Sequence, residues 1–387
     1  MLLCNVQIVG KAGLHNIRVS GDKITDVSEE YLTRNNDNET QIEFSDVIAF
    51  PGLINSHDHL DFNLFRQTGN RIYKNYAEWG KDIHQQNKRS INAVVKIPQD
   101  IRIQWGVYKN LLNGITTVVN HGQTLNIRDN FITVLQNNHD LHSIQFEKNW
   151  KFHLNNPFKN ERPFVIHVGE GTDQAAHNEI DQLIRWNVFN KTIIGVHGIA
   201  MDPGQATAFK ALVWCPASNY FLFGATAAID KLKAKTSILF GTDSTLSASW
   251  NLWEHLRLAR NAVLLNDSEL FDSLTKTPAA IWKQNGAGSI AVNNQAEIVV
   301  ATARNKTGFD SFYSINPEDI QLILSKGEIL LFDEAIKDQL MAANFSVSSF
   351  SKICINRNIK YVYGDVPALM NKVFSYYPEA DIPISIS

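Results

Sequence analysis

Two histidines separated by one residue, His57 and His59, follow the apolar run 51–56. In a β-strand, side chains two positions apart point to the same side, so both imidazoles can reach one point just beyond the strand. Imidazole is a common ligand of divalent metals. Because such a pair also arises by chance or for structural reasons, further ligands are needed before a metal site is predicted.

Polar side chains follow other apolar runs in the same way. His167 and His197 each end a run rich in β-branched residues, and Asp243 comes shortly after another. In a βα barrel the carboxyl ends of all strands face one side, where active sites are built. Three histidines and a carboxylate at that side form a nitrogen and oxygen donor set with room for water, as in catalytic zinc sites. The less favoured alternative is that each group only satisfies its own loop.

Two further segments lie at strand ends. Glu170 begins the loop three residues after His167. Away from a metal it would be a solvated loop carboxylate. Next to one, in a site with little water, its pKa would rise toward neutrality, and Glu170 could move a proton between water and a substrate nitrogen. In the segment 215–219 we interpret Cys215 as a small buried side chain and Asn219 as a brace for a loop.

The elements that position these residues alternate between strands and helices. Apolar runs typical of strands buried on both faces of a parallel sheet cover 115–119, 164–166, 193–196, 211–214 and 238–240. Helix start signals lie between them, at Thr172 and at Asp202 before Pro203. Repeating strand–helix units predict a βα barrel or a doubly wound sheet.

The two ends of the chain have a different pattern. Apolar and polar residues alternate over 6–27, which predicts short antiparallel strands, and the alternation returns over 290–331. We therefore expect a small β-domain built from both ends and interrupted by a metal-binding α/β domain. Residues 346–387 have no clear period and are not assigned to elements. The expected domain segments are 1–50, 51–285 and 286–387.

The composition excludes several classes of protein. The 387 residues are 44% hydrophobic and include 21 Phe and 8 Trp, so the chain can bury a large core and is not intrinsically disordered. A net charge of −3, without a basic patch interleaved with aromatics, argues against nucleic-acid binding. Three widely spaced cysteines cannot build a disulfide framework, and no apolar run approaches the length of a membrane span. We expect a cytoplasmic protein with no membrane contact.

Six segments together carry a family resemblance. They are 51–59 (PGLINSHDH), 114–118 (GITTV), 167–170 (HVGE), His197, 215–219 (CPASN) and 241–244 (GTDS). In this order they resemble the amidohydrolase superfamily, in the branch of the cytosine, guanine and S-adenosylhomocysteine deaminases and the triazine hydrolases. The resemblance spans roughly residues 49–259. It implies a (β/α)8 barrel of the TIM type and a small composite β-sandwich. The third and fourth strands must be compressed, because little chain separates His121 from His167, and 141–146 is the expected third strand.

The resemblance also implies roles for individual residues. One divalent metal, Zn²⁺ or alternatively Fe²⁺, would be held by His57, His59, His167 and Asp243. The acid/base and substrate-polarising groups would be Glu170, His197 and Asp243. Binuclear members use a lysine or glutamate of the fourth strand as well, and this alternative is left open because that stretch contains Glu147, Lys148 and Lys151.

The implied reaction is hydrolytic deamination of an aminated purine, pyrimidine, pterin or triazine by metal-activated hydroxide. An alternative is a cyclic-amide hydrolase resembling imidazolonepropionase, and a third hypothesis is an inactive metal-binding homologue. The loops 61–86 and 247–256 are expected to form the substrate pocket, but they identify no specific heterocycle, and a homodimer is left open. The candidate substrate contacts are Phe65, Arg66, Tyr76, Trp79, His121 and Trp250.

Overall fold

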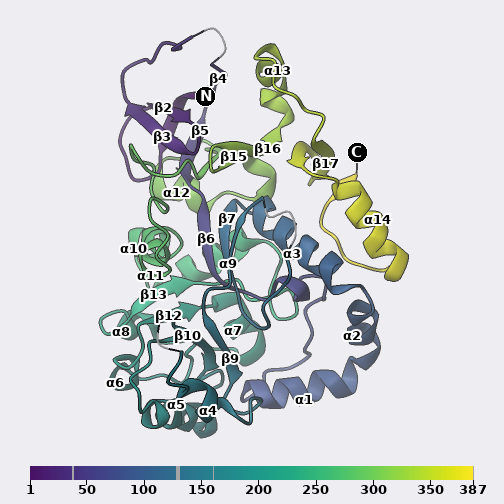
Figure 1. The fold of residues 1–387 in the computed structure, drawn as a ribbon. Coiled ribbons are helices and arrows are strands. Elements are labelled where there is room, and N and C mark those ends of the chain that lie inside the picture. Colours follow the sequence, from purple (N-terminus) through teal and green to yellow (C-terminus); the bar gives the residue numbers. More distant parts are fainter. Residues whose placement is uncertain (37–38, 128–130, 160, 387) are drawn as a thin grey trace.

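Two parallel sheets form the centre of the computed structural model, which describes residues 1–36, 39–127, 131–159 and 161–386 (Figure 1). The strand order is β6-β7-β8 in one sheet and β13-β12-β11-β10-β9 in the other. The strands are β6 (Leu53–Asp58), β7 (Ile115–Asn120), β8 (Thr133–Leu135), β9 (His139–Ser143), β10 (Phe164–Val168), β11 (Ile193–His197), β12 (Ala211–Trp214) and β13 (Ser237–Phe240). The expected mixed α/β fold with a parallel core is confirmed.

The ends of β6 and β13 bring the two sheets together. The backbone N–H groups of Thr242 and Asp243 both donate to the carbonyl oxygen of His57, at 3.2 and 3.1 Å. A side chain at Gly241 would not fit here, because a Cβ atom would lie 2.8 Å from the Cβ of His57 and 2.8 Å from Val213. This close approach places the carboxyl ends of both sheets at one site.

The predicted strands three and four required a correction. The expected third strand over 141–146 overlaps β9, the fourth parallel strand in chain order, whereas the third is β8. The three residues between β8 and β9 are all described and contain no helix. The short, half-buried strand β8 has too few residues for a periodic signal. The missing crossover helix accounts for the shortness of this stretch.

Helices follow most of the parallel strands. Helix α1 lies on the carboxyl-terminal side of these strands, at the end of the molecule opposite the eleven-stranded sheet formed by β1–β5 and β14–β19 (Figure 1). The predicted cap Asp202 begins its helix, together with Gln205 in a capping box. For the preceding helix the cap is Asp173, not Thr172, because the Asp173 side chain accepts from the N–H of Ala176. The helices are α1 (Tyr76–Gln86), α2 (Lys88–Val95), α3 (Gln99–Leu112), α4 (Trp150–Leu154), α5 (Gln174–Trp186), α6 (Pro203–Ala206), α7 (Pro216–Phe223), α8 (Ile229–Leu232), α9 (Leu252–Asn261), α10 (Asp267–Asp272) and α11 (Lys276–Ile281), with the 3₁₀ turn η1 (Leu60–Phe62).

Strands from both ends of the chain share one eleven-stranded sheet. The predicted antiparallel strands over 6–27 are confirmed by the β1–β2 and β2–β3 pairings, and β5 pairs with β14 to join the two ends. The strands of this eleven-stranded sheet are β1 (Leu2–Ile8), β2 (His15–Ser20), β3 (Lys23–Ser28), β4 (Gln41–Glu43), β5 (Val47–Pro51), β14 (Ile298–Thr302), β15 (Ile320–Ser325), β16 (Glu328–Asp333), β17 (Phe350–Ile355), β18 (Asn358–Tyr363) and β19 (Ser385–Ile386).

The C-terminal segment that the sequence left unassigned adds β17, β18 and β19 to this sheet, together with α14 (Val366–Tyr376). Tyr108 of α3 donates to the carbonyl oxygen of Tyr363 at 2.9 Å, which ties the segment to the α/β core. The alternation seen at Ile290 and Val292 belongs to a loop, not to a strand. The remaining helical elements are α12 (Gly308–Tyr313), α13 (Glu334–Ala342) and the 3₁₀ turn η2 (Pro317–Asp319).

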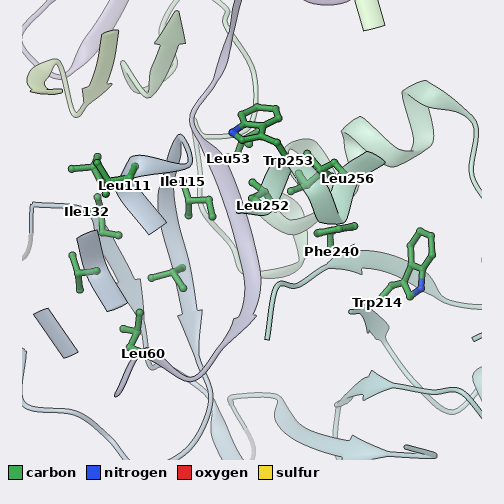
Figure 2. Packing of buried hydrophobic residues seen from close by; sticks show 14 of the residues in the cluster. Leu53, Leu60, Leu111, Ile115, Ile132, Trp214, Phe240, Leu252, Trp253 and Leu256 are labelled. Atoms are coloured by element: carbon green, nitrogen blue, oxygen red, sulfur yellow. The ribbon is translucent and has the colours of Figure 1, made fainter. Parts of the chain in front are cut away.

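The apolar core lies behind the strand that carries the paired histidines. Figure 2 shows β6 between two groups of buried side chains, with Leu111 and Ile115 on one side and Trp253 and Phe240 on the other. Dense packing of this kind resists displacement of the strand and therefore holds the end of β6 in place. In the part of the chain that is described, no helix combines the length and apolar character needed to cross a bilayer.

Candidate active site

The four predicted metal ligands meet at the strand ends. The Nε2 atom of His167 lies 3.4 Å from that of His59 and 3.3 Å from that of His57. The Oδ1 atom of Asp243 lies 3.8 Å from His57 Nε2 and 3.7 Å from His59 Nε2. A tetrahedral ion with bonds of about 2.1 Å separates its ligand atoms by about 3.4 Å. These four separations are close to the spacing of donor atoms that share one divalent ion, and His57, His59 and Asp243 form a possible metal-binding group by themselves.

In two of the three histidines, hydrogen bonds at the far side of the ring determine which nitrogen faces the cluster. The Nδ1 atoms of His59 and His167 lie 3.1 and 2.8 Å from the backbone carbonyl oxygens of His121 and His142. A carbonyl oxygen only accepts hydrogen bonds, so each Nδ1 carries a proton and each Nε2 keeps a free lone pair. Burial lowers the pKa of His57 and His167 well below the ordinary value, which keeps these imidazoles neutral, as metal ligands must be.

Asp243 is held in a defined orientation by two serines that the sequence did not single out. Its Oδ2 accepts hydrogen bonds from Ser218 at 2.9 Å and from Ser247 at 2.8 Å, which leaves Oδ1 facing the histidines. Burial by itself would raise the pKa of Asp243, but His59, His197 and the two serine hydroxyls lower it below the ordinary value. Asp243 is therefore an ionised acceptor.

Glu170 and His197 lie beside this cluster, on the neighbouring strand ends. Glu170 Oε1 is 3.7 Å from His197 Nε2. Burial, followed by the nearby charges of Asp243 and Glu179, raises the pKa of Glu170 well above its ordinary value, which favours the protonated form of the carboxyl group. The Nδ1 atom of His197 lies 2.8 Å from Asn219 Oδ1, so Asn219 braces this histidine.

A buried ion pair behind the ligands was not predicted. The Nζ atom of Lys109 on α3 donates to Asp58 Oδ2 at 3.0 Å and to Thr242 Oγ1 at 3.1 Å. Asp58 also accepts from Asn110 at 2.7 Å. These bonds connect the end of β6, α3 and the end of β13. The one available signal was a lysine among the apolar residues of 101–112, and it did not identify Asp58 as the partner.

A cavity of about 560 Å³ opens in front of the ligand cluster, within the range of small-molecule sites. Of the six predicted substrate contacts, Tyr76 and Trp79 line it. Trp79 Nε1 donates to the carbonyl oxygen of Thr68 at 2.7 Å, which fixes the indole ring. Phe62, His142, Phe146 and Leu246 also line the cavity but were not predicted.

The other four predicted contacts lie outside the lining of the cavity. Phe65 packs on Phe62 with ring centroids 5.5 Å apart, and Arg66 donates to the carbonyl oxygen of Glu379 at 3.1 Å. Trp250 packs against the core. His121 is buried behind the ligands, with its ring centroid 4.3 Å from that of His167. Neighbouring side chains in the loops alternate between cavity and core, and that alternation cannot be read from residue type.

The candidates for a second metal site lie elsewhere. Glu147 accepts from the N–H of His142 at 3.0 Å and pairs with His153. Lys148 is exposed, and Lys151 Nζ lies 4.1 Å from the ring centroid of Trp186. The structure brings none of these three described residues to the ligand cluster.

Comparisons with family models and with curated proteins give no match. Solved structures do match. An adenosine deaminase from Xanthomonas campestris with bound zinc has a TM-score of 0.70 at 14% identity, over 97% of each chain. Atrazine chlorohydrolase from Arthrobacter aurescens TC1, complexed with zinc, has a TM-score of 0.68 at 14% identity, over 97% of this chain and 99% of the other. Guanine deaminase from C. acetobutylicum with bound guanine has a TM-score of 0.63 at 13% identity, over 85% of this chain and 99% of the other.

The chain has the fold of these hydrolases. The fold that the sequence resemblance implied is thus shared with two deaminases and a chlorohydrolase. At identities of 13 to 14% the likeness is one of architecture, and it extends over 85 to 97% of this chain.

Proposed function

We propose that the protein is a metal-dependent hydrolase that deaminates an aminated heterocycle. The observation that carries this proposal is that Glu170, a buried carboxyl group whose pKa is raised, lines the same cavity as His59, His167 and Asp243. The cluster suits a divalent ion, and the acid suits a leaving group or ring atom that must gain a proton. The neighbours named above, which act on adenosine, guanine and atrazine, favour the same class of reaction.

The residues that would hold the metal are His57, His59, His167 and Asp243. Zn²⁺ is the preferred ion, with Fe²⁺ as the alternative, because three neutral imidazoles and one carboxylate suit both. When bound, such a metal supplies activation of a water molecule and polarisation of the substrate. All remaining steps can be assigned to side chains of this chain.

Asp243 and Glu170 divide the proton transfers. Water loses a proton to the ionised Asp243 as its oxygen bonds to the ring carbon that carries the amine, and Glu170 protonates the adjacent ring nitrogen. The amine then takes the proton from Asp243, the C–N bond breaks and ammonia leaves. The new hydroxyl group returns a proton to Glu170 as the ring carbonyl forms. Both carboxyl groups end in their starting states.

His197 would position the attacking water in this scheme. Burial lowers its pKa, and Nδ1 is committed to Asn219, so the neutral ring presents Nε2 as a hydrogen-bond acceptor. From there it can accept a hydrogen bond from the incoming water or from the hydroxyl group of the tetrahedral intermediate. The interaction orients the nucleophile beside Glu170.

The pocket suits a flat ring. Trp79, Phe62 and Phe146 present aromatic surface, and Leu246 adds aliphatic surface near Asp243. A planar heterocycle between such faces gains apolar contact while its amine reaches the ligand cluster. A cyclic-amide hydrolase could use the same groups, but the solved neighbours that act on adenosine and guanine favour deamination.

We also propose a finer architecture. The two parallel sheets would form one eight-stranded barrel within 51–285, since the hydrogen bonds to His57 from the segment after β13 join their edges. Residues 1–50 and 286–387 would build a β-sandwich domain, since strands from both ends pair through β5 and β14. Substitution of Gly241 by a larger residue should disturb both the contact between β6 and the segment after β13, which would close the barrel, and the metal site.

An ammonia-release screen with metal-replete protein tests the function. Aminated purines, pterins, pyrimidines and triazines should include at least one substrate, with water oxygen incorporated into the product ring. His57→Ala should abolish both metal binding and release, whereas Arg66→Ala, outside the cavity, should leave both unchanged. Ring opening of a cyclic amide without ammonia, or faster hydrolysis of phosphotriesters than of any heterocycle, would overturn the deaminase assignment.

A further inference from the structure

A buried imidazole nitrogen without a partner lies behind the proposed metal ligands. Of the two buried ring nitrogens of His121, Nδ1 lies 3.2 Å from Oδ1 of Asp140, whereas Nε2 has neither a hydrogen-bond nor an ion-pair partner. His121 directly follows β7 and is 2% exposed. Leaving such groups unpaired costs free energy, and native structures rarely do so, which indicates that a group outside the described chain completes this spot.

The position of His121 points to a metal. One of its ring nitrogens lies within 4.8 Å of ligand atoms of both His57 and His167, and these three residues form one of the two ligand groups among the described residues. The His121 ring centroid is 5.0 Å from that of His57 and 5.3 Å from that of His59. His121 therefore shares His57 and His167 with the proposed metal site, although it is absent from the cavity wall.

The second nitrogen of His121 follows the pattern of two of the proposed ligands. Its Nδ1 lies 3.2 Å from Oδ1 of Asp140 on β9. In His59 and His167 the Nδ1 atom likewise faces an oxygen acceptor, which leaves Nε2 free. A carboxylate behind an imidazole is a common support for a metal-ligating histidine, because it fixes the tautomer and the ring orientation.

We propose that His121 is an additional ligand of the metal, and that Asp140 is its positioning residue. The proposal rests on the metal site of the proposed function and adds a fifth protein donor to it. Four imidazoles, one carboxylate and a water make a site with more donors than a tetrahedral zinc site uses. Such a donor set suits Fe²⁺, Co²⁺ or Mn²⁺ as well as Zn²⁺.

The first test uses the wild-type protein loaded with Co²⁺ alone. The visible d–d bands of Co²⁺ are intense in four-coordinate sites, intermediate in five-coordinate sites and weak in six-coordinate sites. With five protein donors and a water, we expect weak six-coordinate bands in the wild type and intermediate bands in His121→Asn, which removes one donor. A four- or five-coordinate spectrum in the wild type would overturn the proposal without any variant being needed.

The second test measures the metal affinity of the variants by chelator competition with Zn²⁺ and Co²⁺. His121→Asn should lose at least about 100-fold, and Asp140→Asn about 10- to 100-fold, the range for a residue that supports a ligand. His15→Asn is the matched control, because His15 is buried with an unpartnered Nδ1 but lies on β2, in the eleven-stranded sheet. It should keep wild-type affinity.

The outcomes separate this inference from the function on which it rests. If the wild type binds metal tightly and His121→Asn binds it equally well, His121 is a core histidine hydrated by an internal water, and the inference alone fails. If the wild type binds no divalent metal, the proposed function fails with it. Thermal unfolding of the metal-free variants identifies any that do not fold, and the wild-type Co²⁺ spectrum then decides.

Discussion

The ammonium group of Lys109 lies 3.0 Å from Oδ2 of Asp58, and both side chains are fully buried, with 1% and 0% of their surface exposed. Asp58 separates the two histidines of β6, and Lys109 also bonds Thr242, the residue before Asp243. One cation therefore connects the segments that supply three of the four proposed ligands. Its loss should affect stability and the metal site together.

Lys109→Met should destabilise the protein by about 3–5 kcal/mol, because it leaves the Asp58 carboxylate buried without its partner. The double variant with Asp58→Asn should recover part of that loss, since the uncompensated charge is gone. Urea unfolding of the metal-free proteins measures both. A loss below about 1 kcal/mol in the single variant would show that the pair has no structural role.

Glu170→Gln should keep the metal but lower kcat by about two to four orders of magnitude, the usual contribution of a positioned acid or base. In the wild type the rate should fall as pH rises through the raised pKa of Glu170, because the acid form is the active one. Metal content and a pH–rate profile check these points. Near-normal turnover, or a wild-type rate that does not fall at high pH, would contradict the assignment.

Glu179 should make folding stability depend on pH. Burial raises its pKa to about 7, although the Gly169 N–H and the Tyr76 hydroxyl bond to the carboxyl group. Between the ordinary value of 4.5 and about 7 the folded state holds a proton that the unfolded state has lost, so stability falls as pH rises through this window.

A pKa shift of this size corresponds to a loss of roughly 3 kcal/mol in the free energy of unfolding between pH 4.5 and 7. As pH rises across this window, the wild type should lose about that much more unfolding free energy than Glu179→Gln, which lacks the titrating group. Urea unfolding of both proteins at several pH values measures it. Parallel stability curves for the two proteins would contradict the assigned pKa.

Ser218→Ala and Ser247→Ala should each weaken metal binding, because the hydroxyl groups hold Oδ2 of Asp243 and so aim Oδ1 at the cluster. A loss of about 10-fold for each is expected, and more for the double variant. Ser311→Ala, a buried serine that bonds the carbonyl oxygen of Ala303, is the matched control. Chelator competition gives the affinities, and unchanged affinity in the double variant would contradict the role.

Trp79→Ala should raise KM for the heterocycle roughly tenfold through the loss of a stacking face. Trp79→Phe keeps an aromatic ring but not the Nε1 hydrogen bond to Thr68, so it should recover most of the affinity. Steady-state kinetics of the two variants separate stacking from support of the loop. Equal KM in the wild type and Trp79→Ala would place the substrate elsewhere in the cavity.

The meeting of the proposed metal ligands at one place could be predicted from local pattern. His57, His59, His167 and Asp243 are recognisable because each lies at the end of an apolar run, and parallel strands all end at the same side of a sheet. The alternation at the N-terminus predicted β1 to β3 for a similar reason, since a two-residue period is a property of the strand itself. The strand-end positions and the two-residue alternation are both set by residues that are close together in the sequence.

The remaining features depend on contacts between residues far apart in the chain. The partner of Lys109 is 51 residues away, and nothing local indicates that Asp58 faces it. Strand β8 has three half-buried residues and is stabilised by pairing with β7, which leaves no periodic signal. Phe65 and Trp250 turn to the core, whereas Trp79 turns to the cavity. The orientation of a loop side chain is set by the packing it meets, and that packing exists only once the chain has folded.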